Sequence, residues 1–520
     1  MIPFDSSGAF RPKTPGHELR RLAVRGATAT VSASGLSLAV QVISTVVLAR
    51  LLTPADFGVV TMVTTFSLLL SSFGGNGFTE AIIQCEEIDH QTASNLFWLG
   101  SGSGLVLAIS FAEAGSLLAR FYRNPLVAHV AMGVSVGIFI SATPVVHLAL
   151  LRRAMRFAGV SANLVLGQVV LTGVSILLAF RGWGYWALVG GTVAWQLSIA
   201  LGGWWLCRWV PSPPRRTGRT GAMVRFAAKV YGRYCLGYST QNIDNLLVGW
   251  KFNAVDLGFY KKAYDLFALS ASQLTAPLHN VALATLSRLN QDRDRFQRYL
   301  VNALGIVAFV GMAMSADLTL VGKDVVRLVL GPQWSESGRI FALFGPGVGA
   351  MLLSSMVSWI HLSIGEPGRW LRWNVVQLVF TVALFLTALP WGPAGIAAAW
   401  SISYWTLLIP SFWYAGRPID FGVAALIAAV WRHIAAALAA GLATAAILRG
   451  TSYWAAPSGA GAALLAIVVV SSLFLALYLA VTILLHRGLA PLRQLASLLR
   501  ELAPAKGTAR PAVEPAGGSK

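Results

Sequence analysis

Long apolar runs dominate this sequence and restrict what it can fold into. About fourteen segments are apolar over roughly 20 residues, the length that a helix needs to cross about 30 Å of hydrocarbon. Of the 520 residues, 56% are hydrophobic and only 12% are charged, which lies outside the usual range of soluble domains. We therefore predict an all-α polytopic membrane protein. Its expected spans are residues 27–50, 57–83, 93–118, 126–150, 159–180, 184–207, 223–249, 256–285, 299–320, 337–363, 370–389, 393–415, 434–449 and 461–485.

The positions of Lys and Arg predict the orientation of these spans. About 27 of the 40 basic residues fall in segments on the same side as the N-terminal tail. Loops on the cytoplasmic side of a membrane carry such an excess, so we expect both termini in the cytoplasm and an even number of spans. The formal charge of +20 has the same explanation, and no basic face interleaved with aromatic residues suggests nucleic acid as a partner. The N-terminal tail is polar and basic, unlike a cleaved signal peptide.

The apolar segment 420–433 differs from the expected spans because Arg432 and His433 stand at its end. As part of a full span it would place a charge in the hydrocarbon. We therefore predict a helix that lies in the membrane interface, ahead of the span 434–449.

A Pro, Gly and Arg-rich stretch at 209–221 divides the chain into halves of comparable length. Asp56-x-Gly58 in the first half matches Asp256-x-Gly258 in the second, and further short matches keep a similar offset. We predict an internal duplication that produces two pseudo-symmetric six-helix lobes, with the substrate path between them and alternating access. The expected units are a cytoplasmic N-terminal tail (1–26), an N-lobe (27–208), a cytoplasmic linker (209–222), a C-lobe (223–416), the interfacial helix with two additional spans (417–486), and a cytoplasmic, largely disordered tail (487–520).

Four stretches together resemble a known family: ARLLTPADFGVVTM in the first half, NIDNLLVGWKFNAVDLGFYKKAYDL in the second, VLGPQW at 329–334 and IGEPGR at 364–369. They are similar to the Wzx-like polysaccharide biosynthesis flippases of the multidrug/oligosaccharidyl-lipid/polysaccharide exporter superfamily, in particular its exopolysaccharide and colanic-acid subgroup. The resemblance runs from about residue 20 to residue 490.

This resemblance implies a fourteen-helix protein of the bacterial inner membrane. Such a protein moves undecaprenyl-pyrophosphate-linked oligosaccharide repeat units to the periplasmic leaflet for exopolysaccharide or lipopolysaccharide biosynthesis. The expected partners are this lipid-linked oligosaccharide and membrane lipids, with a polysaccharide polymerase and a chain-length regulator as candidates.

An anionic, lipid-linked cargo calls for basic residues at membrane depth, because Lys and Arg can match the charge of pyrophosphate. Lys229 and Arg233 lie four residues apart on one helical face, and they either line the cleft or anchor the helix near its cytoplasmic end. Four further candidates near the outer ends of spans either face the cleft or extend to the interface. These four are Arg50, Lys251, Lys261 and Lys262.

Asp244 and Glu80 are the carboxylates expected deepest in the hydrocarbon, and both are candidates for binding a coupling ion, H+ or Na+. The alternative for Asp244 is a structural network in which Asn242 and Asn245 bond to neighbouring spans. Ser44 stands at the equivalent position of the first half, so this carboxylate has no counterpart there.

Asp56 and Asp256 each open the second span of a half, and we interpret them as helix caps repeated by the duplication.

Other chemistries find little support in the sequence. Cys85, Cys207 and Cys235 lie far apart without metal-ligand spacing, so we expect neither disulfides nor a metal site. No P-loop suggests ATP hydrolysis, and no cofactor is expected. One alternative function is a cation-coupled multidrug exporter on the same fold, whose cavity should be acidic and aromatic. A second, a membrane polysaccharide polymerase or ligase, would need a long outer loop, and the longest expected one is residues 321–336, so we predict no enzyme activity.

Overall fold

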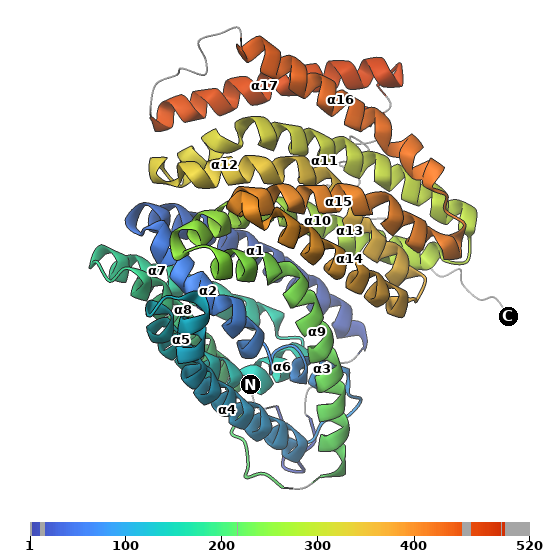
Figure 1. Ribbon diagram of the computed structural model, residues 1–520. Coiled ribbons are helices and arrows are strands. Elements are labelled where there is room, and N and C mark those ends of the chain that lie inside the picture. Colours follow the sequence, from blue (N-terminus) through green and yellow to red (C-terminus); the bar gives the residue numbers. More distant parts are fainter. Residues whose placement is uncertain (1–2, 11–15, 216, 450–458, 490, 494–520) are drawn as a thin grey trace, which may run out of the picture.

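A computed structural model describes residues 3–10, 16–215, 217–449, 459–489 and 491–493 (Figure 1). Within these residues the chain is helical, with only isolated β-bridges between Phe4 and Phe10 and between Ala9 and Asp89. Ten stretches of the described chain are long and apolar enough to cross a membrane, which confirms a multi-pass, all-α membrane protein. One of the ten, Gly368–Ile419, contains two helices, and the count of fourteen spans stays a prediction.

The described part of the first half of the chain forms eight helices, which we call the N-lobe. They are α1 (Gly16–Leu51), α2 (Pro54–Ser71), α3 (Phe78–Gln84), α4 (His90–Tyr122), α5 (Leu126–Ala142), α6 (Val145–Arg153), α7 (Phe157–Phe180) and α8 (Tyr185–Cys207). Within it, α7 packs against α1 and α8, and α5 packs against α2, α4 and α8.

The second half begins with seven helices, which we call the C-lobe, joined in places by short 3-10 turns. They are α9 (Gly218–Lys251), α10 (Ala254–Leu289), α11 (Arg293–Val329), α12 (Ser335–Phe344), α13 (Val348–Ser363), α14 (Pro367–Ala388) and α15 (Gly392–Gly416), with η1 (Pro332–Trp334), η2 (Gly345–Gly347), η3 (Leu389–Trp391) and η4 (Arg417–Ile419). Two more helices, α16 (Val423–Arg449) and α17 (Ala460–His486), pack on α11 at the edge farthest from the N-lobe (Figure 1).

Several expected spans consist of two helices. Span 57–83 is α2 and α3, separated by a turn that contains Gly74, Gly75 and Gly77. Span 126–150 is α5 and α6, and the break between them contains Pro144. Span 337–363 is α12 and α13, which meet at the Gly-Pro-Gly turn η2. Glycine lowers the stability of a helix and proline cannot donate a backbone hydrogen bond, so these breaks follow from the local sequence.

Two expectations about helix boundaries were wrong. The segment 420–433 is not a separate helix, because α16 runs without a break from Val423 to Arg449 and carries Arg432 and His433 in its interior. His433 is buried and Arg432 is exposed, so a single continuous helix separates the two side chains onto different faces. The first helix begins at Gly16 instead of near Ala27.

The linker between the lobes lies along the start of α4. The indole nitrogen of Trp98 donates to the carbonyl oxygen of Ser212 at 2.8 Å, and the amide of Asn95 donates to that of Arg215 at 2.6 Å. Gln91 makes a similar bond to Pro213 at 3.0 Å. The stretch expected as a spacer is therefore bound to the N-lobe. The expected disorder of the C-terminal tail concerns mainly residues 494–520, which lie outside the described residues.

Candidate functional site

The two lobes meet where α2 crosses α10, and the repeated glycines make this contact possible. A Cβ atom at Gly58 would overlap the backbone carbonyl of Ala254, and one at Gly258 would overlap that of Pro54. Each glycine thus faces the first residue of the opposite helix. The contact is reciprocal, as expected for two copies of one unit related by a pseudo-two-fold axis.

The aspartates of the repeated motif stabilise the helix starts beside this contact. Thr53 is the N-cap of α2, and Asp56 completes a capping box by accepting from the Thr53 backbone nitrogen at 2.9 Å. In α10 the N-cap is Asn253, whose side chain accepts from the Asp256 nitrogen at 2.9 Å. The aspartates therefore occupy the third helical position and the preceding residues are the caps, a small correction to the expected role.

The end of α1 is clamped by the turn η1, which carries the VLGPQW motif. The fully buried Trp334 donates from its indole nitrogen to the carbonyl oxygen of Ala49 at 2.8 Å, and Gln333 donates to the same oxygen. The Trp334 ring packs on Phe57 and Phe259, one from each lobe. A C-lobe turn thus joins an N-lobe helix.

A related contact, with the roles of the two lobes exchanged, occurs between α4 and α9. A Cβ atom at Gly249 would lie 2.8 Å from the ring of Tyr122, which is buried at the end of α4. Gly249 stands 200 residues after Ala49. These equivalent positions of the two halves each contact an aromatic residue of the other lobe, Trp334 at Ala49 and Tyr122 at Gly249. This pairing extends the pseudo-symmetry beyond the glycine motif.

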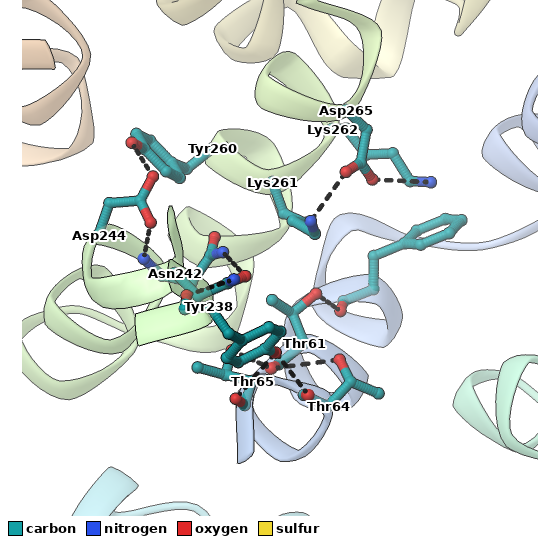
Figure 2. A network of polar contacts seen from close by, with 12 residues as sticks. Thr61, Thr64, Thr65, Tyr238, Asn242, Asp244, Tyr260, Lys261, Lys262 and Asp265 are labelled. Atoms are coloured by element: carbon teal, nitrogen blue, oxygen red, sulfur yellow. Dashed lines mark hydrogen bonds and ion pairs between the residues drawn. The ribbon is translucent and has the colours of Figure 1, made fainter. Parts of the chain in front are cut away.

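The middle of α9 contacts the N-lobe through tyrosine hydroxyls, of which Figure 2 shows that of Tyr238. Tyr238 donates to the backbone oxygen of Thr65 at 3.0 Å, and Tyr231 donates to that of Leu69 at 2.8 Å. The hydroxyls of Tyr234 and Ser72 are 3.1 Å apart. These bonds hold α9 to the part of α2 that lies away from the close contact between α2 and α10 at Gly58 and Gly258.

Lys261, Lys262 and Asp265 form a charged cluster on α10 (Figure 2). The Nζ atom of Lys261 lies 2.8 Å from one Asp265 oxygen, and that of Lys262 lies 4.0 Å from the other. Lys262 also lies 3.9 Å from the centre of the Phe57 ring in the N-lobe. Both lysines therefore have local partners that reduce their capacity to bind an anion.

Asp244 is 3% exposed, and its carboxylate links α9 to α10 (Figure 2). It accepts from the Tyr260 hydroxyl at 2.8 Å and from the Asn245 backbone nitrogen at 2.8 Å. The side chains of Asn242 and Asn245 bond only within α9, to Tyr238 and to each other, among the hydrogen bonds of the described residues. The expected bonds from these asparagines to other spans are thus not formed, and Tyr260 supplies the inter-helix contact.

A cavity of about 400 Å³ opens inside the C-lobe between α9, α10, α13, α14 and α15, and it adjoins a second hollow of about 550 Å³. Arg233 and Asp244 contribute its only Lys, Arg, Asp or Glu side chains within the described lining. The guanidinium of Arg233 lies 5.0 Å from the centre of the Trp370 ring, a cation–π arrangement. The remaining polar lining comes mainly from side-chain amides and hydroxyls, including Asn374 and Tyr404.

The structure does not bring the six basic candidates into one cleft. Both Arg233 and its neighbour Lys229 are exposed, but only Arg233 lines the C-lobe cavity. Arg50 donates to the backbone oxygen of Leu328 at 3.3 Å and lines a different hollow. Lys251 is exposed at the end of α9.

Glu80 lies in the short helix α3, apart from the C-lobe cavity. One of its carboxylate oxygens is buried without a hydrogen-bond partner among the described residues.

Sequence reasoning missed the aromatic and amide side chains of the cavity. Trp370 and Gln377 come from α14 and Tyr404 from α15, more than a hundred residues after Arg233. Asn374 could have been found, because it keeps the offset of 211 from Asn163 that relates other short matches of the two halves. Asn163 itself donates to the Ile199 backbone within the N-lobe.

The cysteines and the other acidic groups give no sign of metal chemistry. All three cysteines are free, and burial raises the pKa of the Cys85 thiol in the loop after α3. Over the described ranges, no group of three or more His, Cys, Asp or Glu side chains could hold a metal ion.

Solved structures with the same fold are membrane transporters. The lipid II flippase MurJ, in an inward closed conformation, superposes with a TM-score of 0.71 at 13% identity, covering 88% of this chain and 98% of that one. An inward-facing multidrug resistance MATE family transporter gives 0.59 at 15% identity, covering 74% and 94%. The fold is therefore that of the two-lobed transporters represented by MurJ and MATE proteins.

Comparison of sequences identifies the family. The family described as "Polysaccharide biosynthesis protein" matches residues 47–339, and the chain belongs to it. A second family, "Lipid II flippase MurJ", matches residues 214–470.

Named relatives are distant and are matched over about two thirds of their length. The succinoglycan biosynthesis transport protein ExoT of Rhizobium meliloti (strain 1021) is 21% identical over 64% of this chain and 68% of its own. The lipopolysaccharide biosynthesis protein WzxC of Escherichia coli (strain K12) is 21% identical over 61% and 65%. The teichuronic acid biosynthesis protein TuaB of Bacillus subtilis (strain 168) is 20% identical over 59% and 65%.

Proposed function

We propose that this protein is a flippase for lipid-linked oligosaccharides. It would move undecaprenyl-pyrophosphate-linked repeat units across the bacterial inner membrane for exopolysaccharide or lipopolysaccharide biosynthesis. The observation that supports this best is the reciprocal contact of Gly58 and Gly258, which joins two pseudo-symmetric lobes at one end in a member of the polysaccharide biosynthesis family. The names of the relatives, which include transport and biosynthesis of surface polysaccharides, support the same cargo.

The proposed mechanism is alternating access by rocking of one lobe against the other. With both termini in the cytoplasm, as the Lys and Arg distribution favours, the glycine contact lies at the periplasmic end. This arrangement closes the path toward the periplasm and leaves the cytoplasmic end as the entry side. A transporter needs no catalytic residue, and a polysaccharide polymerase with a chain-length regulator would act on the delivered repeat units.

Arg233 is the residue we propose to contact the cargo from the C-lobe. Its guanidinium lines the cavity and has no acidic partner among the ion pairs of the described residues. Phosphate oxygens form strong, often bidentate hydrogen bonds with arginine, and the Trp and Tyr rings nearby can pack on sugar faces. The paired Lys261 and Lys262 are weaker candidates for this role.

Asp244 is the group we propose to bind a coupling ion, H+ or Na+. It is buried and lines the cavity, and Asn374 and Tyr404, which carry oxygen ligands, line the same space. Replacement by Asn keeps the volume and removes the charge. If Asp244 couples transport, Asp244→Asn should change the dependence of transport on proton or sodium gradients in vesicles; unchanged dependence would leave only a structural role for this carboxylate. Glu80 is the second candidate and can be tested in the same way.

Rescue of a deletion strain tests the cargo and the role of Arg233 together. Wild-type protein should restore exopolysaccharide output, and Arg233→Ala should lower it about tenfold or more at an equal protein level, since a charged hydrogen bond contributes about 1.5–3 kcal/mol. Lys229→Ala, which alters an exposed residue one helical turn away, is the matched control and should retain output. Equal output from the two variants would contradict the role of Arg233.

A cation-coupled multidrug exporter is the second candidate, because Asp244 and several aromatic rings in the cavity also suit an organic cation. The two functions are separable by experiment. Uptake of a fluorescent cation into inverted vesicles, together with normal polysaccharide output in the deletion strain, would favour the exporter. Absence of cation transport with loss of polysaccharide favours the flippase.

A further inference from the structure

A hollow of about 410 Å³ lies at the end of the N-lobe that carries the start of α1. Its walls come from α1, from the turn between α6 and α7, and from the end of α8. Close packing holds α1 in place, because a Cβ at Gly26 would lie 2.8 Å from the ring of Phe157. Met155 and Arg208 adopt left-handed backbone conformations with φ of 57° and 46°, which turn the chain at the ends of α6 and α8. These elements bring three distant parts of the sequence together.

Three arginines line this hollow: Arg25, Arg156 and Arg208. All three are exposed, and none takes part in an ion pair among the described residues. In the part of the chain that the structure describes, the hydrogen bonds of arginine side chains are made by other arginines. The distribution of Lys and Arg explains why each stands at this end of the protein, but it does not require that they converge on one space.

The rest of the lining is apolar. Leu22, Leu151 and Met155 contribute side chains from α1 and the α6–α7 segment. Trp205 also lines the hollow and is 67% exposed, so a large apolar surface faces outward beside the arginines. Tryptophan is enriched at the level of lipid headgroups, where one end of the ring system is apolar and the other polar.

We propose that this hollow binds the phosphate headgroup of an anionic membrane lipid. Arginine binds phosphate oxygens through a planar, bidentate arrangement of donors, and basic pockets between helices on the cytoplasmic side bind anionic headgroups. The apolar wall around Trp205 would contact the acyl chains. The site is separate from the C-lobe cavity and shares no lining residue with it. The inference does not depend on the identity of the transported cargo.

Native mass spectrometry of the purified full chain, titrated with phosphatidylglycerol or with phosphatidylcholine of the same acyl chains, tests the proposal. The wild type should bind one phosphatidylglycerol on the order of 10- to 100-fold more tightly than phosphatidylcholine, since each basic residue near a membrane surface contributes roughly a factor of five. The combined variant Arg25→Gln, Arg156→Gln and Arg208→Gln should lose this preference.

A matched control removes the same charge elsewhere at the same predicted end of the protein. Arg288→Gln, Arg298→Gln and Arg372→Gln change exposed arginines outside this hollow and should leave the preference within about twofold of wild type. Equal loss in the two combined variants would show that net charge alone attracts the lipid and would overturn the proposal.

Two further measurements address folding and the source of the phosphate. Ala158→Trp keeps all three arginines but fills the hollow, so it should reduce the preference even if the combined variant does not fold. Glycerophosphoglycerol, the headgroup without acyl chains, should not displace the lipid at equal concentration. Displacement by this soluble compound would assign the site to free phosphate esters and overturn the lipid as ligand.

Discussion

Where α2 meets α10, the lobes approach backbone to backbone at Gly58 and Gly258, whereas the same α2 meets the middle of α9 through tyrosine hydroxyls. The first region excludes any larger side chain and is shielded by the buried Trp334. The second depends on hydrogen bonds to carbonyl oxygens that helical backbone already uses, and water can replace such bonds at small cost.

The two contacts should resist separation of the lobes in different ways. A backbone contact is lost as a unit once the helices move apart, because close packing does not tolerate small displacements. Hydroxyl contacts can break one at a time. The start of α9 is itself packed on the N-lobe, since a Cβ at Gly77 would lie 2.9 Å from the backbone oxygen of Ala227. We therefore expect α9 and α2 to separate beyond this contact, along the tyrosine-bonded part of α9, at a lower cost than at the glycine end, which should stay closed.

The largest effect should come from filling the glycine contact. In Gly58→Val the new side chain would overlap the backbone of Ala254, which cannot move aside as a side chain could, so we expect about 4 kcal/mol or more of lost stability or a failure to fold. Thermal unfolding in detergent, with expression level as a second readout, measures it. Gly232→Val is the control, because a Cβ at Gly232 meets no atom within 4 Å. Equal melting temperatures would show that the lobes are not in contact there.

A smaller effect is expected for the clamp on α1. Trp334→Phe removes the hydrogen bond to Ala49 and part of a fully buried ring, which should cost about 2 kcal/mol. Chemical or thermal unfolding checks this value. The comparison variant is Trp391→Phe at a side chain that is 73% exposed, and it should differ from wild type by less than about 0.5 kcal/mol. A loss as large in the comparison variant would show that the clamp adds nothing specific.

The tyrosine end can be loosened without disturbing the glycine end. Tyr231→Phe with Tyr238→Phe removes both donors to α2 and should favour opening by about 1–2 kcal/mol, which corresponds to roughly a 5- to 30-fold faster reaction of the half-buried Cys235 with a maleimide. The measurement needs a background in which the other two cysteines are alanine. Tyr299→Phe should leave the rate unchanged. An unchanged rate in the double variant would place the resistance to opening elsewhere.

The smallest effect is expected at the exposed end of α9. Lys251→Ala should alter stability by less than about 0.5 kcal/mol, since the side chain is exposed. Lys262→Ala should cost more, because this buried lysine contacts Phe57 of the other lobe and lies near Asp265. Thermal unfolding of the pair distinguishes a lysine at the surface from one at the lobe interface, and equal values would contradict the distinction.

Much of the fold follows from local sequence properties. Apolar runs locate the membrane helices because each must satisfy its own backbone and present apolar side chains to lipid. The repeated Asp-x-Gly motif also pointed to a structural role before the contact at Gly58 and Gly258 was known. Hydropathy did not reveal that α16 is continuous, since Arg432 is exposed on one face while the neighbouring His433 is buried on another.

The candidate site was less predictable for a physical reason. The sequence identifies charged residues in apolar surroundings, and it thereby found Arg233 and Asp244. It does not show which neutral side chains gather around them, because Trp370 and Tyr404 resemble any other aromatic residue near a helix end. It also did not separate Lys261 and Lys262 from the other basic candidates near span ends, although these two have a carboxylate partner on their own helix.

The hydrogen bonds from α4 to residues 212–215 change where the two halves of the chain can bend. A proline- and glycine-rich connection would ordinarily act as a loose tether, but here it is fastened to the N-lobe and moves with it. Any rotation of the C-lobe has to be taken up beyond this attachment, within α9 itself. That helix has glycines at 232 and 237 with open space around them. Bending of α9 at these glycines would let its second half move with the C-lobe while its start stays on the N-lobe.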